Sequence, residues 1–175
     1  MTQRHGLVQL FTGEGKGKTS AALGTVLRAS GHGFRTYIIF FMKSELPHGE
    51  IAALRHLSNV EIAKYGGLKF VNPDRIKPED IAKAGEALAA AREAMLSGRY
   101  DLIVLDELNI AVAFKLVELD EVIKLIKDKP PEVELILTGR YADPKLVESA
   151  DLVTEMLKIK HPYDKGVPAR RGIEY

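Results

Sequence analysis

The chain has no cysteine among its 175 residues. It can therefore form no disulfide framework, no thiolate metal site and no dithiol redox relay of its own. It also lacks any apolar run close to the roughly 20 residues that a membrane-spanning helix needs. Only a few residues precede the first strand-like run. We therefore expect a protein that is neither exported nor inserted in a membrane. A cytoplasmic location fits this composition, although the absence of cysteine does not by itself establish it.

An excess of charge of one sign is absent as well. Lysine and arginine together number 25 against 24 aspartate and glutamate, for a formal net charge of +1. This balance creates no global field that would attract nucleic acid or an anionic membrane, so any basic site must be local. The length and the 46% of hydrophobic residues suit one core, and we predict a single domain over residues 1–175.

Continuous apolar runs alternate with segments of helical period along the chain. We predict strands at 7–11, 36–42, 102–105 and 133–137, and helices at 19–30, 81–96, 119–127 and 144–149. Strands without polar alternation are buried on both faces, which indicates an α/β fold with a mainly parallel sheet covered by helices on both faces. Ligands of such sheets bind at the carboxyl ends of the strands.

Two segments break this rhythm. Residues 64–78 contain paired glycines and two prolines, which predicts a long connection of the kind that forms lids or binding loops. Residues 158–175 have no regular period and several prolines and glycines, so we expect an extended C-terminal tail over the surface.

The strongest chemical signal lies between the first predicted strand and helix, in Thr12-Gly-Glu-Gly-Lys-Gly-Lys-Thr19. Glycines here let backbone N–H groups converge on phosphate oxygens, and the following helix adds positive potential. Lys18 would neutralise phosphate charge and the Thr19 hydroxyl would ligate Mg²⁺. The alternative is a glycine-rich turn that binds nothing. We assign the whole loop to a nucleoside triphosphate, which would bind through Thr12, Gly13, Glu14, Gly15, Lys16, Gly17, Lys18, Thr19 and Ser20.

The loop departs from the strict phosphate-loop pattern at one position. That pattern asks for a glycine five residues before Gly17, where this chain has Thr12 and places its glycine at 13. The shift indicates a specialised subgroup of phosphate loops.

Two carboxylates end the apolar run at 102–105. Such carboxylates usually face the phosphate loop and complete its metal site. We predict Glu107 as the closer Mg²⁺ ligand, directly or through water, with Asp106 in support. The alternative is that both residues cap a helix that begins near Asn109.

An ordered set of further segments runs along nearly the whole chain: Arg28-Ala-Ser-Gly-His-Gly33, Pro47-His-Gly-Glu50, Val104-Leu-Asp-Glu-Leu-Asn-Ile110, Leu137-Thr-Gly-Arg140, Ala150-Asp-Leu-Val-Thr-Glu-Met156, Lys160-His-Pro-Tyr-Asp-Lys-Gly166 and Gly172-Ile-Glu-Tyr175. Together with the loop and its glycine at 13, this set resembles the ATP:cob(I)alamin (corrinoid) adenosyltransferases of the P-loop type.

The resemblance implies transfer of the 5′-deoxyadenosyl group of ATP to Co(I) of a reduced corrinoid, with release of triphosphate. It implies a homodimer with a RecA-like sheet, in which ATP lies in the reverse of the usual sense across the loop. Co(I) is a powerful nucleophile and needs no general base, so Lys18, Lys16, the loop amides and a Mg²⁺ held by Thr19 and Glu107 would act on the leaving triphosphate. A separate flavoprotein or ferredoxin would supply the electrons.

The resemblance also implies roles for three residues in connections. Leu68 and Phe70 match an apolar and aromatic pair that displaces the lower ligand of cobalt and eases its reduction; the alternative is that both simply anchor a loop to the core. Lys43 would contact nucleotide or corrinoid.

Other functions fit the phosphate loop by itself. An ordinary P-loop ATPase or small-molecule kinase would act at the γ-phosphate, with Glu107 orienting or deprotonating the attacking water or hydroxyl. A thymidine-kinase-like protein generally needs a cysteine zinc site that this chain cannot build. A non-enzymatic module would bind nucleotide or corrinoid and deliver it.

Overall fold

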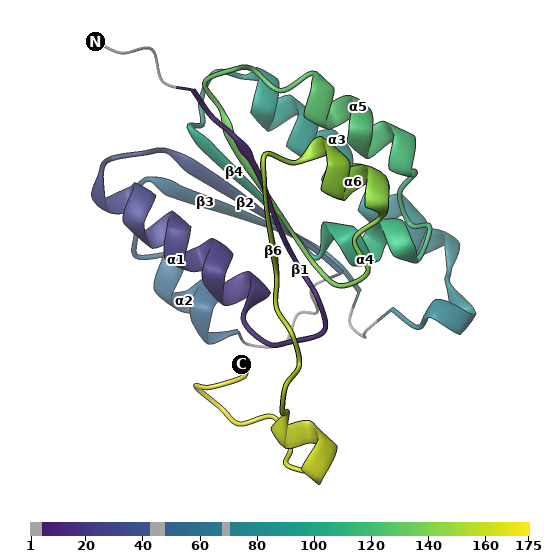
Figure 1. The fold of residues 1–175 in the computed structure, drawn as a ribbon. Coiled ribbons are helices and arrows are strands. Elements are labelled where there is room, and N and C mark those ends of the chain that lie inside the picture. Colours follow the sequence, from purple (N-terminus) through teal and green to yellow (C-terminus); the bar gives the residue numbers. More distant parts are fainter. Residues whose placement is uncertain (1–4, 43–47, 68–70) are drawn as a thin grey trace.

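The computed structural model of the chain describes residues 5–42, 48–67 and 71–175. Its strands form a six-stranded sheet in the order β3-β2-β4-β5-β1-β6, and every neighbouring pair is parallel (Figure 1). The predicted parallel α/β fold is therefore confirmed. The strands are β1 (Val8–Thr12), β2 (Thr36–Phe41), β3 (Val60–Tyr65), β4 (Leu102–Asp106), β5 (Glu134–Thr138) and β6 (Leu152–Glu155).

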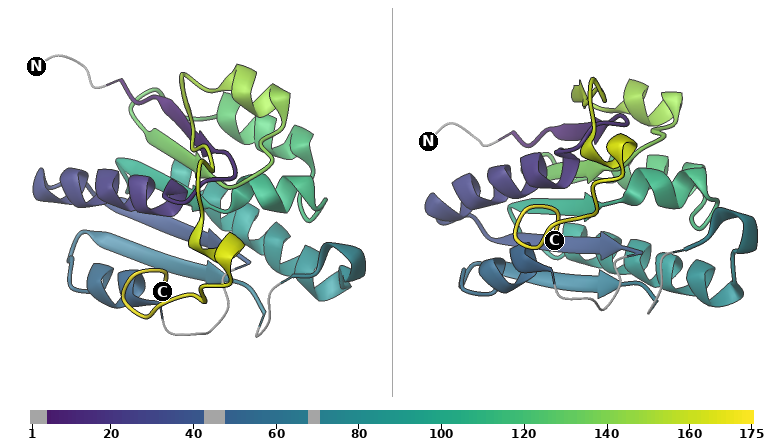
Figure 2. Two further views of the ribbon diagram at one scale, coloured as in Figure 1. Left: turned by 60° about the horizontal axis from the view of Figure 1, so that its bottom comes forward. Right: turned by 90° about the horizontal axis from the view of Figure 1, so that it is seen from below.

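Helices cover both faces of the sheet (Figures 1 and 2). Helices α1 (Lys18–Gly31) and α2 (Gly49–Leu54) pack on one face. The opposite face carries α3 (Pro78–Leu96), α4 (Leu108–Ala113), α5 (Leu119–Lys127) and α6 (Pro144–Ser149). None of the helices in the described part of the chain is long and apolar enough to cross a bilayer.

The central strands are buried because their sequences are apolar without alternation. All five residues of β4 are buried, and β4 lies between β2 and β5. Helix α3 meets its side of the sheet through four buried alanines at helical spacing, Ala84, Ala87, Ala91 and Ala94. Small side chains on one stripe let the helix lie close to the strands.

The order of the strands brings the ends of distant segments together. β5 lies between β1 and β4, so the segments that follow these three strands emerge side by side at one edge of the sheet. This is the arrangement of a P-loop RecA-like sheet. The phosphate loop follows β1 and the two carboxylates end β4, so the fold places both at the same edge.

The predicted elements agree with the structure in most of the chain. Helices 119–127 and 144–149 have the predicted bounds, and strand 133–137 is shifted by one residue. Strands β3 and β6 and helix α2 were not predicted. Residues 64–65 belong to β3, and the connection after it contains the short 3-10 helix Pro73–Arg75. The C-terminal tail contains another, Pro162–Lys165, and its last residues return to the phosphate loop.

Candidate active site

The phosphate loop is held against the chain that leaves β6. The amide of Gly15 donates to the carbonyl oxygen of Met156 at 2.6 Å, and the Met156 amide donates to the carbonyl of Thr12 at 2.9 Å. Gly13 has a φ of 95°, and a Cβ there would lie 2.5 Å from the Met156 carbonyl oxygen. Only glycine fits such a left-handed position at this separation. The shifted glycine therefore has a local structural reason.

Lys18 is the first residue of α1 and is almost fully buried, with 7% of its surface exposed. Its Nζ donates to the carbonyl oxygens of Gly13 and Gly15, both at 2.7 Å. Burial lowers the pKa of Lys18, and the carboxylates of Glu107 and Glu14 offset this only in part. The ammonium is thus incompletely compensated inside the loop, and a bound anion would stabilise it.

Asp106 at the end of β4, and Glu107 directly after it, are bonded to the end of β5. Asp106 is 1% exposed, and its Oδ1 accepts a hydrogen bond from the Thr138 hydroxyl at 2.7 Å. The same hydroxyl oxygen accepts from the Glu107 amide at 3.0 Å. Glu107 has a φ of 62°, which lets the chain turn from β4 directly into α4. Its side chain makes no capping hydrogen bond to that helix, which argues against the capping alternative.

Gly139 completes this junction. Its φ is 131°, and a Cβ there would lie 3.0 Å from the Asn109 Cβ and 3.2 Å from Oε2 of Glu107. The Asn109 side-chain amide donates to the Gly139 carbonyl at 2.9 Å. The glycine after β5 therefore lets the Glu107 carboxylate pack beside that strand end.

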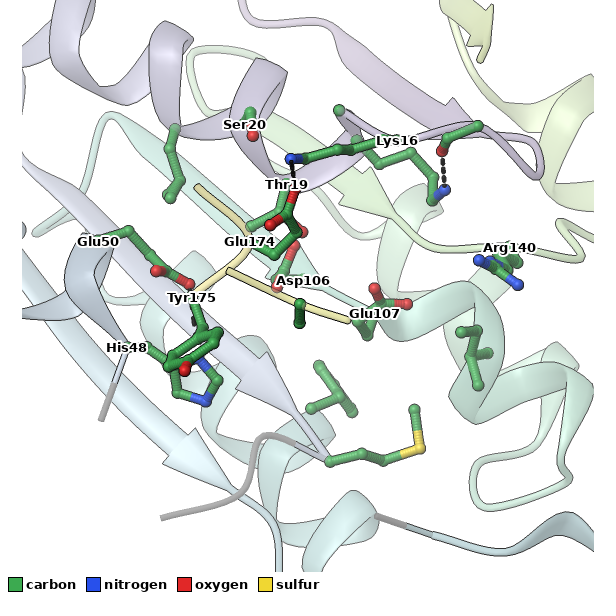
Figure 3. Close-up of a pocket in the computed structure, with 18 of the residues that line it drawn as sticks. Lys16, Thr19, Ser20, His48, Glu50, Asp106, Glu107, Arg140, Glu174 and Tyr175 are labelled. Carbon is green, nitrogen blue, oxygen red and sulfur yellow. Dashed lines mark hydrogen bonds and ion pairs between the residues drawn. The ribbon is translucent and has the colours of Figure 1, made fainter. Parts of the chain in front are cut away.

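Lys18, Asp106 and Glu107 line one cavity of about 1110 Å³ at the carboxyl edge of the sheet. Figure 3 shows its labelled polar side chains. They come from the phosphate loop and the start of α1, from the ends of β4 and β5, from the start of α2 and from the C-terminus. The predicted residues that line it are Gly15, Lys16, Gly17, Lys18, Thr19, Ser20, Asp106 and Glu107. Apolar lining comes from Leu23, Phe41, Met42, Val71, Ile110 and Phe114.

Three predicted loop residues are not among the described residues that line the cavity. The Thr12 hydroxyl oxygen accepts from the Ala142 amide at 3.4 Å, and the Gly13 carbonyl holds Lys18. Glu14 forms an ion pair with Arg140 at 3.1 Å, between Oε2 and Nη1. These residues brace the loop in this structure.

The oxygens of Thr19, Asp106 and Glu107 suit a hard cation such as Mg²⁺. Among the described residues, no cluster of three or more His, Asp or Glu side chains could hold a metal ion by itself. Mg²⁺ is commonly bound by one or two carboxylates together with substrate phosphates and water. The residues present therefore fit a cation that arrives with a polyphosphate.

Several lining residues had no role assigned from the sequence. Arg140 follows β5, His48 and Glu50 lie at the start of α2, and Glu174 and Tyr175 belong to the tail. All of them fall in segments that carry the family resemblance, which was the one signal that could have found them. Leu68, Phe70 and Lys43 lie outside the described residues, so their predicted roles stay predictions.

A phosphate loop on a RecA-like parallel sheet, facing paired carboxylates across one cavity, defines a P-loop protein. The model of the ATP:corrinoid adenosyltransferase family BtuR/CobO/CobP matches residues 4–175. The chain belongs to this family, as its motifs predicted.

Relatives in three bacteria are named corrinoid adenosyltransferases. The protein of Pseudomonas aeruginosa is 37% identical over 170 residues, which cover 97% of this chain and 84% of the relative. The protein of Escherichia coli is 35% identical over 171 residues, with 97% and 86% covered. The protein of Salmonella typhimurium is 34% identical over 174 residues, with 99% and 87% covered. The family favours adenosyl transfer over an ATPase or kinase acting at the γ-phosphate.

Proposed function

We propose that this chain transfers the 5′-deoxyadenosyl group of ATP to Co(I) of a reduced corrinoid, cobalamin or a precursor. The observation that carries the proposal is a cavity shared by the phosphate loop, the carboxylates of Asp106 and Glu107, and an apolar wall. Ligand pockets commonly measure about 300–1,000 Å³, so a cavity of about 1110 Å³ has room for a nucleotide and for part of an apolar corrin face.

The reaction forms a Co–C bond and breaks the bond between C5′ and the triphosphate oxygen. Co(I) supplies both electrons of the new bond, and the electrons of the broken bond leave with the triphosphate. Because the nucleophile needs no deprotonation, the chain's task is to orient C5′ and to stabilise the leaving group. Lys18, the loop amides and Lys16 would meet the negative charge as it develops.

The Thr19 hydroxyl and the Glu107 carboxylate would hold Mg²⁺, with Asp106 in support. When bound, the ion would neutralise charge on the triphosphate oxygens. The Thr138 hydroxyl holds one Asp106 oxygen and the Glu107 amide in place. The Asp106 carboxylate and the Glu107 backbone are thereby held to the end of β5.

The proposal extends to the partners and the location of the protein. A chain without cysteine offers no dithiol for reducing cobalt, which supports a separate flavoprotein or ferredoxin as reductant. The family resemblance supports a homodimer, and the cysteine-free composition fits a cytoplasmic location. The near-neutral charge supports a protein that binds neither nucleic acid nor membrane. Leu68 and Phe70 beneath cobalt, and Lys43 at a substrate, stay part of the proposal.

An anaerobic assay tests the reaction with ATP, Mg²⁺ and chemically reduced cob(I)alamin. We expect a light-sensitive Co–C product together with triphosphate, and no triphosphate when the corrinoid is omitted. Corrinoid-independent release of phosphate would instead support an ordinary P-loop ATPase. Tight corrinoid binding without product would support a delivery module.

A further inference from the structure

The last seven residues, 169–175, form a compact turn that closes on itself; we call it the C-terminal turn. The Gly172 amide donates to the Tyr175 carbonyl at 2.7 Å, and the Glu174 amide donates to the Arg170 carbonyl at 2.9 Å. The turn lines the candidate active site with Ala169, Gly172, Ile173, Glu174 and Tyr175. The C-terminal turn is therefore part of the wall of the nucleotide cavity, although it is far from the phosphate loop in sequence.

The turn lies between two other elements of that wall. On one side, Lys16 of the phosphate loop donates to the Ile173 carbonyl at 3.1 Å and to the Glu174 carboxylate at 2.9 Å. On the other side, a Cβ on Gly49 would lie 4.0 Å from the Tyr175 carbonyl carbon, and Figure 3 shows the Tyr175 ring beside His48. The turn thus connects the phosphate loop with the start of α2.

Glu174 is the centre of these contacts. Its Oε1 accepts from Lys16 Nζ and from Arg170 Nη2, each at 2.9 Å. Its Oε2 accepts from the Arg170 amide at 2.7 Å and from Arg170 Nε at 3.2 Å. Only 22% of the Glu174 side chain is exposed, against 48% for Lys16. The carboxylate is therefore held by four hydrogen bonds, and Lys16 is the more exposed of the two partners.

The geometry of Lys16 leaves room for a ligand. An ammonium has three N–H donors, and the two contacts with the C-terminal turn use two of them. Lys16 itself lines the cavity. A phosphate oxygen can therefore bind the third N–H while both contacts to the turn persist.

We infer that Glu174 is a positioning residue for ATP: through Lys16 it fixes a cation at the phosphate loop, and the C-terminal turn forms one wall of the triphosphate site. The inference rests on the proposed function, since it assigns the cavity to ATP. It adds contacts with the phosphate loop to the tail that the sequence predicts over the surface. A lysine that is already ordered loses less side-chain entropy when phosphate binds.

A simple electrostatic account makes the opposite prediction. Glu174 is a negative charge close to a site for a polyanion, so its removal should strengthen triphosphate binding if charge were its only effect. Positioning predicts weaker binding, because the free Lys16 chain must then be ordered by the ligand. The sign of the change therefore separates the two accounts.

The experiment compares Glu174→Gln with wild type by calorimetry, using inorganic triphosphate and ATP as separate ligands. Glu148→Gln is the matched control, because Glu148 is an exposed carboxylate on α6 outside the cavity lining. Lys16→Met, and the variant that combines it with Glu174→Gln, complete a double-mutant cycle. We expect Glu174→Gln to weaken triphosphate binding roughly three- to ten-fold, the range of a good exposed ion pair, and to change nothing in the Lys16→Met background.

Each remaining result bears on the inference. Tighter or unchanged binding by Glu174→Gln would overturn it, and so would an equal loss in the Lys16→Met background, because that pattern indicates general damage to the fold. In the transfer assay, we expect Glu174→Gln to raise the KM for ATP and to leave kcat nearly unchanged. Wild type and the three variants can show the expected pattern of triphosphate binding while wild type forms no adenosyl product. In that case the inference stands and the proposed transfer fails. If wild type binds no triphosphate, both fail.

Discussion

Lys18 and Lys16 stand two positions apart in the phosphate loop and are held by different parts of the molecule. Lys18 is buried and bonds to carbonyls of its own loop, three and five residues away. Lys16 is half-exposed and bonds to a turn 157 and 158 residues further along the chain. Local sequence therefore suffices to place one cation, whereas the other depends on tertiary structure.

The largest expected effect comes from Lys18→Ala. This variant removes the buried cation nearest the loop carbonyls, so we expect the rate of adenosyl transfer to fall roughly 100- to 1,000-fold, as when a preorganised transition-state contact is lost. Turnover with chemically prepared Co(I) measures the effect, and an unchanged far-ultraviolet circular dichroism spectrum serves as the control for folding. A wild-type rate would remove Lys18 from the mechanism.

Gly15→Ala tests how far the loop depends on the chain after β6. A Cβ at this position would lie 2.6 Å from the Leu157 carbonyl oxygen and 2.7 Å from that of Met156. The loop would have to move, and we expect stability to fall by about 1–3 kcal/mol together with weaker ATP binding. Thermal unfolding and calorimetry measure both.

Gly24→Ala is the matched control, because it lies within α1 and an added Cβ meets nothing within 4 Å. Alanine at a helix interior should raise stability by about 0.5–1 kcal/mol. Equal destabilisation by both substitutions would show that the contact with residues 156–157 does not control the loop.

Lys16→Ala should have a smaller effect than Lys18→Ala. Lys16 is half-exposed, and solvent screens its interaction with phosphate. We expect the KM for ATP to rise roughly three- to ten-fold and kcat to fall much less than in Lys18→Ala. Steady-state kinetics at several ATP concentrations separates the two constants. A fall in kcat as large as that of Lys18→Ala would contradict the distinction between the two lysines.

The parts of the site that follow from local sequence were predictable. Glycines, Lys18 and Thr19 stand between an apolar strand and a helix, and Asp106 and Glu107 end a buried run; each pattern is complete within about ten residues. The order of parallel strands then explains why these segments lie at one edge.

The other parts depend on contacts that no local pattern records. β6 is an edge strand with all four residues exposed, so it has no buried run to detect. Thr138 meets Asp106 only because β5 lies between β1 and β4. The prolines and glycines of the tail correctly indicate irregular structure, but they carry no information on where Glu174 docks.

The smallest expected effect concerns acid. Hydrogen bonds from Arg170, and then from Lys16, lower the pKa of Glu174 from 4.5 to about 2. The contacts of a carboxylate with a lowered pKa stabilise the folded protein fully at a pH above the ordinary pKa of the group. This stabilisation is lost as the pH falls toward 2. Titration of the Glu174 carboxyl carbon by NMR should therefore give a midpoint near 2 in wild type, with the amide spectrum as the control for folding. Arg170→Gln should move the midpoint toward 4.5 more than Lys16→Ala does, because Arg170 makes the larger contribution. A wild-type midpoint near 4.5 would show that the C-terminal turn does not hold Glu174 in solution, and the difference between the two lysines would then reduce to their burial.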